Sequence, residues 1–206
     1  MPQILIFGDS ITYGAWDKEG GWVQRLRKFL DEKTLADNGH FSVYNLGISG
    51  DNTEDLLERV EAETRHRLKE KEKMVFVFAI GVNDSQFIHS KNNLRVIPEE
   101  FENNIRDLIN ISKQFSSKII FIGLTSVDES KTTPIPWNTD KSYKNEYIKK
   151  YDDIIKKVCE ENKINHVRVF DKLKIADFED GLHPNSAGHQ KIFEIVKKFL
   201  IDNKII

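Results

Sequence analysis

Cysteine is nearly absent from this sequence, and long hydrophobic runs are absent altogether. Cys159 is the single cysteine in 206 residues, which excludes an internal disulfide framework and a cysteine-based metal site. No apolar run approaches the roughly 20 residues that a membrane-spanning helix needs. The start of the chain lacks the basic and apolar regions of a signal peptide. We therefore expect a soluble, cytoplasmic protein in which Cys159 packs within a helix.

The sequence also lacks an excess of charge of either sign. Lys and Arg total 31 and Asp and Glu total 33, which gives a formal net charge of −2. Without a dominant basic surface, nucleic acid is not expected as the main partner. The length fits one domain, so we expect residues 1–206 to form a single domain, as a monomer or a small homo-oligomer.

Short apolar segments alternate with longer amphipathic ones along the chain. The segments that predict strands are Ile4–Phe7, Phe41–Leu46, Met74–Ile80, Lys118–Gly123 and His166–Phe170. Helical periodicity follows each of them, in Gly21–Leu35, Thr53–Leu68, Pro98–Phe115, around Tyr147–Val158 and around Ile192–Leu200. Strict alternation predicts an α/β fold with a parallel sheet and helices on both faces. The segments Gly81–Ile97 and Thr125–Lys141 are expected to be long loops.

Small and polar residues gather where the predicted strands end. Ser10 follows the first strand, Gly47 the second and Asn83 the third, while Asp180 and His183 follow the fifth. Ligands of open parallel sheets bind beyond the carboxyl ends of the strands. With the strand order 2-1-3-4-5, the first three of these residues would converge. The segment before Asp180 is long enough to bring His183 back to Ser10.

These residue types fit nucleophilic attack on a carbonyl group. A serine hydroxyl becomes an effective nucleophile when histidine removes its proton. Asp180 stands three residues before His183, a spacing that allows its carboxylate to orient the imidazole. The N–H groups of Ser10 and Gly47 and the side-chain amide of Asn83 are candidate donors to an oxyanion. Each motif alone also fits an ordinary turn or cap, and only the combination indicates catalysis.

Other polar residues near these motifs have simpler interpretations. Asp9 and Asp84 could compete with Asp180 as the acid. However, Asp9 suits a turn or cap beside Ser10, and Asp84 suits a role in orienting Asn83 and its loop. Ser49 is expected to be part of a loop, because its surroundings lack the glycine spacing of a nucleophile elbow.

The segments FGDSITYG, NLGISGDNT, GVNDS and DGLHPN occur in this order from the first strand to the last helix. With them the sequence resembles the SGNH hydrolases, also called the GDSL esterase/lipase family, over essentially its whole length. The resemblance implies the roles given above to Ser10, Gly47, Asn83, Asp180 and His183. It implies a flavodoxin-like three-layer α/β/α sandwich with a five-stranded parallel sheet, and no metal or organic cofactor.

The substrate is less constrained than the chemistry. Members of this family act on simple esters, thioesters, lysophospholipids and acetylated sugars. Trp16, Phe87 and Trp137, together with Asp9, are candidates for a substrate pocket, although the aromatic residues could equally anchor loops. The long loops are otherwise polar, which favours a small ester with a short acyl or acetyl group. Acyl transfer, thioester or lysophospholipid hydrolysis, and a non-catalytic flavodoxin-like binding module remain alternatives.

Overall fold

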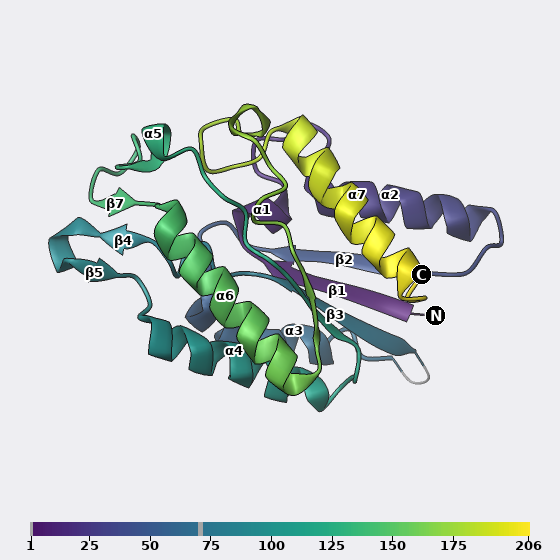
Figure 1. The fold of residues 1–206 in the computed structure, drawn as a ribbon. Coiled ribbons are helices and arrows are strands. Elements are labelled where there is room, and N and C mark those ends of the chain that lie inside the picture. The colour runs from purple at the N-terminus through teal and green to yellow at the C-terminus, as the bar shows by residue number, and fades with distance from the viewer. Residues whose placement is uncertain (1, 70–71) are drawn as a thin grey trace.

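The computed structural model describes residues 2–69 and 72–206 and is built around a parallel sheet (Figure 1). Its neighbouring strands pair in parallel in the order β2-β1-β3-β6-β8. Counted among themselves, these strands have the predicted order 2-1-3-4-5. Their bounds are Pro2–Gly8 for β1, Ser42–Gly47 for β2, Lys73–Ala79 for β3, Ile119–Ile122 for β6 and Asn165–Val167 for β8.

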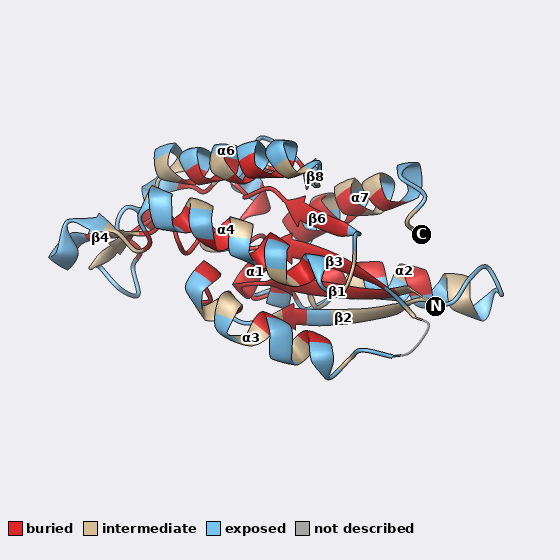
Figure 2. Ribbon diagram, turned by 90° about the horizontal axis from the view of Figure 1, so that it is seen from below, coloured by how far each residue is buried: buried red, intermediate tan, exposed pale blue. Residues whose placement is uncertain are grey.

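Helices cover both faces of this sheet, which confirms the predicted three-layer α/β/α fold (Figure 1). On one face α2 packs against α7, and on the other α4 packs between α3 and α6. Figure 2 shows buried residues on the central strands and the inner sides of the helices, with exposed residues outside. The bounds are Gly21–Leu35 for α2, Thr53–Arg65 for α3, Pro98–Lys113 for α4, Asn145–Asn162 for α6 and Ser186–Asp202 for α7.

The central position of β3 explains its continuous apolar sequence. It pairs with a strand on each side and is covered by helices on both faces, so residues of both side-chain orientations are buried. Phe78 stacks on Phe7 of β1 and on Phe121 of β6, which joins the three strands through one aromatic cluster. Cys159 is buried in α6, as its place in the apolar period predicts.

Several elements end earlier than the sequence predicts. α3 stops at Arg65, and Leu68, the predicted end, is 52% exposed, so it does not continue the buried stripe of the helix. β8 stops at Val167, because the chain then turns and the Lys172 N–H donates to the Val169 carbonyl. α4 ends at Lys113, two residues before the predicted Phe115. These differences leave the sheet order unchanged.

A second, small sheet lies beyond the carboxyl ends of the parallel strands (Figure 1). β4 (Phe87–Ile88) pairs antiparallel with β5 (Asn93–Leu94) and with β7 (Lys141–Ser142). Its strands come from the two segments that were expected to be loops, and two residues are too few to show a strand period. The remaining short elements are α1 (Ser10–Tyr13), η1 (His89–Lys91), α5 (Glu129–Thr132) and η2 (Ile175–Asp177).

Candidate active site

Ser10 is the first residue of α1, directly beyond the carboxyl end of β1. Asp9 caps this helix, because its Oδ1 accepts the Ile11 N–H at 2.9 Å, as the cap interpretation predicts. Gly8 permits the close turn, since a Cβ there would lie 2.1 Å from the Thr12 hydroxyl oxygen. The Ser10 N–H belongs to the first helical turn, where the helix offers no acceptor. The hydroxyl and the N–H of Ser10 are therefore held together at the end of the strand.

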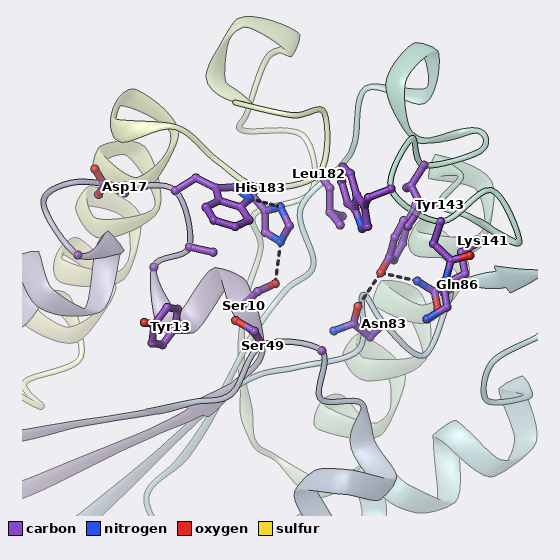
Figure 3. Close-up of a pocket in the computed structure, with 18 of the residues that line it drawn as sticks. Ser10, Tyr13, Asp17, Ser49, Asn83, Gln86, Lys141, Tyr143, Leu182 and His183 are labelled. Atoms are coloured by element: carbon purple, nitrogen blue, oxygen red, sulfur yellow. Dashed lines mark hydrogen bonds between the residues drawn. The ribbon is translucent and has the colours of Figure 1, made fainter.

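The Ser10 hydroxyl meets the imidazole of His183 and, through it, the carboxylate of Asp180. Nε2 of His183 lies 3.0 Å from Ser10 Oγ (Figure 3), and Nδ1 lies 2.7 Å from Asp180 Oδ2. Nδ1 therefore donates to the carboxylate, which leaves the lone pair of Nε2 facing the hydroxyl. Burial alone would raise the pKa of Asp180, but hydrogen bonds from the ring and backbone of His183 lower it to about 2. The carboxylate is thus ionised at neutral pH.

A local turn holds the Asp180 carboxylate against the imidazole. Its Oδ1 accepts the N–H groups of Leu182 at 3.0 Å and of His183 at 2.8 Å. Gly181, inside this turn, has a φ of +93°, and a Cβ there would come within 2.7 Å of Cβ of Lys131. Glycine is required at this position for both reasons.

Trp16 adds a further contact to the Asp180–His183 pair. Its indole Nε1 lies 3.0 Å from Asp180 Oδ2 and 3.0 Å from His183 Nδ1. Because the proton on Nδ1 is already donated to the carboxylate, Asp180 is the acceptor of the indole N–H. Trp16 also has a φ of 65°, a left-handed conformation that is unfavourable for a residue with a side chain. Such a strained conformation persists only where surrounding contacts hold it, and the hydrogen bond to Asp180 is one such contact.

Asn83 is fixed by a chain of buried hydrogen bonds. Its Nδ2 donates to the Asp51 carbonyl at 2.8 Å, and its Oδ1 accepts the Tyr143 hydroxyl at 2.7 Å. The Tyr143 oxygen in turn accepts from Gln86 Nε2 at 2.6 Å (Figure 3). An amide nitrogen carries two protons, so one N–H of Asn83 remains for a ligand. The sequence around Tyr143 carries no pattern that indicates this contact.

Gly47 and Gly50 differ in a way that bears on the expected oxyanion donors. Gly47 is the last residue of β2, and its N–H donates to Asn45 Oδ1 at 3.0 Å, so it is already occupied. A Cβ on Gly47 would lie 2.4 Å from the Tyr13 nitrogen, so this glycine serves close packing. Gly50 lies on the following turn and lines the cavity beside Ser10. Within the described residues its N–H has no acceptor.

A cavity of about 940 Å³ opens above these groups. Trp16 and Trp137 line it and flank the imidazole of His183, with ring centroids 5.7 and 6.3 Å from that ring. Asp9 and Phe87 do not line this cavity. Asp9 is buried beneath Ser10, where burial raises the pKa of its carboxyl to about 6, and Phe87 stacks on Tyr147 of α6. The described residues hold no cluster of side chains suited to bind a metal ion.

Asp84 and Ser49 also lie near the site. Asp84 is buried and accepts the N–H and the hydroxyl of Thr53, so it joins the loop after β3 to the start of α3. This contact supports the loop that carries Asn83, which agrees with the role expected of Asp84. Ser49 lines the cavity on the turn between Gly47 and Gly50, and the imidazole contacts Ser10 instead.

One family model and several solved structures match this chain over most of its length. The model of the GDSL-like Lipase/Acylhydrolase family matches residues 6–191. LAE5, an alpha/beta hydrolase enzyme from the metagenome of Lake Arreo, Spain, has a TM-score of 0.71 and 22% identity, covering 97% of this chain and 93% of that one. The lipase/acylhydrolase from Enterococcus faecalis has a TM-score of 0.73 and 23% identity, with 97% and 95% covered.

Two further relatives extend this comparison. A catalytic mutant of Axe2, an acetylxylan esterase from Geobacillus stearothermophilus, has a TM-score of 0.73 and 20% identity, covering 95% of this chain and 92% of that one. At such identities the solved structures establish the fold. The lipoprotein YqeF of Bacillus subtilis (strain 168) is 30% identical over 126 residues, which are 58% of this chain and 47% of that protein. The match thus spans about half the length of YqeF, and the described helices include none long and apolar enough to cross a membrane.

Proposed function

This chain belongs to the GDSL-like Lipase/Acylhydrolase family and is a serine hydrolase of ester bonds, and we propose that it cleaves short-chain acyl esters with Ser10 as its nucleophile. The observation that carries the proposal is the line of contacts from Ser10 Oγ to His183 Nε2 and from His183 Nδ1 to Asp180 Oδ2. These are the contacts that a nucleophile, a general base and an orienting acid need.

In the proposed mechanism His183 takes the proton of the Ser10 hydroxyl as its oxygen attacks the ester carbonyl. The carbonyl oxygen becomes an oxyanion, and His183 then gives the proton to the departing alcohol. The acyl group remains on Ser10 as an ester. Water, deprotonated by the same imidazole, attacks this acyl-enzyme, and the acid is released with Ser10 restored. Asp180 stays ionised and stabilises the protonated imidazole through both steps.

For the oxyanion we propose the N–H of Ser10, the N–H of Gly50 and the free N–H of Asn83. Gly50 takes the place expected for Gly47, because the Gly47 N–H already donates to Asn45 whereas Gly50 lines the cavity. The hydrogen bond that Asn83 donates to the Asp51 carbonyl and the one it accepts from the Tyr143 hydroxyl keep its amide from rotating when charge develops. Donors that are oriented in advance stabilise the transition state without a cost of reorganisation.

The acyl group is proposed to be short. Polar side chains such as Gln24, Asn45 and Asn138 line the cavity beside Trp16 and Trp137. A long alkyl chain would separate these amides from water without giving them new partners, which is unfavourable. The acetylxylan esterase activity of Axe2 makes acetyl esters a sensible first test.

The proposal is tested with nitrophenyl acetate, butyrate and octanoate and with a serine-reactive phosphonate. We expect acetate or butyrate to be the best substrate and the phosphonate to label Ser10, as located by peptide mapping. Labelling of another serine would reject the proposed nucleophile. Preference for octanoate would reject the short acyl group. Addition of alcohol acceptors measures the competing transfer reaction in the same assay.

A further inference from the structure

The small sheet presents one of its faces to the cavity. Phe87 pairs with Leu94 and with Ser142, so Gln86, one position earlier, lies beside Arg95 and Tyr143. The Arg95 N–H donates to the Gln86 carbonyl at 2.8 Å, which continues the ladder. Neighbours across a ladder share a face, as do residues two apart in one strand. Gln86, Arg95, Lys141 and Tyr143 accordingly all line the cavity.

This face is cationic, although the chain as a whole is not. Arg95 and Lys141 lie on this face, and Lys18 lines the cavity from the segment between α1 and α2, while the chain has a formal net charge of −2. The one carboxylate among the lining residues is Asp17. It accepts the N–H of Gly21 and is paired with Arg25, so its charge is already compensated. Arg95 is likewise paired, with Asp55, so the positive charge that the lining carboxylates and ion pairs leave uncompensated is that of Lys18 and Lys141.

Lys141 is a cation of this face that forms no ion pair with a described residue, in contrast to Arg95. It is half-buried, and no carboxylate of the described residues lies within ion-pair distance of its ammonium group. Its chain neighbour Asp140 belongs to the opposite side of the strand, where its carboxylate accepts the N–H and the hydroxyl of Ser90 at 2.7 Å. Arg95, in contrast, donates to Asp55 at 3.0 Å and to the Gly50 carbonyl at 2.9 Å.

The cationic face lies across the cavity from the proposed nucleophile. Figure 3 shows Ser10 and His183 on one side, Lys141 and Gln86 on the other, and Asn83 between them. The hydrogen bonds from Gln86 to Tyr143 and from Tyr143 to Asn83 connect this face to the proposed oxyanion site. An ester held at Ser10 therefore has room to extend toward Lys141 within the same cavity.

We propose that Lys141, assisted by Arg95, binds an anionic group of the substrate, so that the preferred esters carry a carboxylate or a similar oxyanion beside the scissile bond. This inference rests on the proposed function, because it concerns the same cavity and the same reaction. An ammonium group without a paired carboxylate attracts an anion more strongly than a paired one, since its charge is not already compensated. The anion belongs either to the acyl group or to the alcohol of the ester.

Two pairs of substrates distinguish an anionic group on the acyl part of the ester from one on its alcohol part. Nitrophenyl hydrogen glutarate has the carboxylate on the acyl group, and its neutral counterpart carries a primary amide there. Acetoxybenzoate has the carboxylate on the leaving group, with acetoxybenzamide as the neutral counterpart. The measured quantity is the ratio of kcat/KM for the anionic ester to that for its neutral counterpart. We expect this ratio to exceed unity in one pair and to fall as salt is added.

Lys141→Met is expected to lower that ratio by about tenfold, the effect of one charge-assisted hydrogen bond. Lys91→Met is the matched control, because Lys91 is exposed on η1 beside the same small sheet and does not line the cavity. Arg95→Gln is expected to lower the ratio as well. An unchanged ratio in Lys141→Met for both pairs would overturn the inference. The proposed function would still hold in that case if hydrolysis depends on Ser10. Loss of that dependence would reject the proposed function itself.

Discussion

The Oγ of Ser10 lies 3.0 Å from Nε2 of His183, although the two residues are 173 positions apart in the chain. The parallel sheet makes this contact possible, because Ser10 begins α1 just beyond the carboxyl end of β1 and the segment after β8 returns over the same sheet edge. The turn at Asp180 and the cap of α7 by Asn185 then fix the backbone on both sides of His183. The position of the imidazole thus depends on local turns more than on the sheet.

Ser10→Ala is expected to fold normally and to lower kcat by at least about 10³-fold, because it removes the proposed nucleophile and leaves the imidazole in place. Ester hydrolysis and the far-ultraviolet circular dichroism spectrum are the measurements. Ser49→Ala is the matched control, since Ser49 lines the cavity but does not contact His183, and it should change kcat by less than about tenfold. The reverse ranking of the two variants would assign the nucleophile to Ser49.

Asn83→Ala should lower kcat by on the order of 10²-fold, as expected for the loss of an oxyanion donor. Tyr143→Phe keeps the ring and removes only the hydroxyl that holds Asn83 Oδ1. We expect a smaller loss, about fivefold to tenfold in kcat, because the amide keeps its bond to the Asp51 carbonyl. A change confined to KM in Tyr143→Phe would show that Tyr143 contacts substrate and does not position Asn83.

Gly50→Ala should mainly lower activity, whereas Gly47→Ala should impair folding. A Cβ on Gly50 meets no atom within 4 Å, but its φ of +91° is unfavourable for alanine. We expect this variant to fold with a loss of about 1 kcal/mol and a lower kcat, because the turn shifts the proposed donor. Gly47→Ala would clash with the backbone at Tyr13, so we expect poor folding. A stable, fully active Gly50→Ala would remove Gly50 from the oxyanion site.

The fold and the main polar residues of this site were predictable for different reasons. A parallel sheet follows from alternation, since each crossover buries a continuous segment such as that of β3, whereas the order 2-1-3-4-5 was expected because it brings the first three motifs together. Gly47 follows the second apolar segment directly, and its lack of a side chain suits a close approach to substrate. However, β2 includes that glycine and its N–H donates to Asn45, whereas the Gly50 N–H on the following turn has no acceptor among the described residues. The turn-forming residues Ser49 and Gly50, just before the Asn52 cap of α3, are the sequence feature that could have indicated Gly50 as the donor.

The small sheet was not predictable in the same way. Strands of two residues, such as β4, have no period, and β4 pairs with β7 about 50 residues away, as the contact between Ser90 and Asp140 illustrates. Tyr143 is buried like the residues of the α6 stripe, so its apolar surroundings concealed a hydroxyl that bonds to Asn83. Local sequence shows which side chains are buried but not which polar atom each one meets.

Trp16→Phe tests whether the indole N–H positions the Asp180 carboxylate. Phenylalanine keeps an aromatic ring in the cavity but cannot donate to Oδ2, so we expect kcat to fall about threefold to tenfold with little change in KM. Trp137→Phe is the control, because Trp137 flanks the same imidazole without a hydrogen bond to Asp180. A rise in KM with unchanged kcat in Trp16→Phe would instead indicate that Trp16 only binds substrate.

Asp84→Asn should flatten the dependence of stability on pH. Burial raises the pKa of Asp84 to about 7, whereas aspartate in an unfolded chain titrates near about 3.9. Between these values the folded state keeps a proton that the unfolded state has released, so the free energy of unfolding falls as pH rises. From about pH 5 to about pH 8 this contribution is on the order of 2 kcal/mol. The asparagine variant cannot release that proton, and its free energy of unfolding should fall less over the same range.

Urea unfolding at both pH values measures this difference. Asp107→Asn is the control, because Asp107 is exposed on α4. In this variant the free energy of unfolding should depend on pH as it does in the wild type. Asp9 is unchanged in both variants, and the raised pKa of its carboxyl, about 6, leaves a smaller slope of the same sign in Asp84→Asn. Equal slopes in the wild type and in Asp84→Asn would mean that the carboxyl beside Thr53 is ionised in the folded protein throughout this range. The hydrogen bonds from Thr53 would then outweigh burial, and the loop that carries Asn83 would be held by a charge.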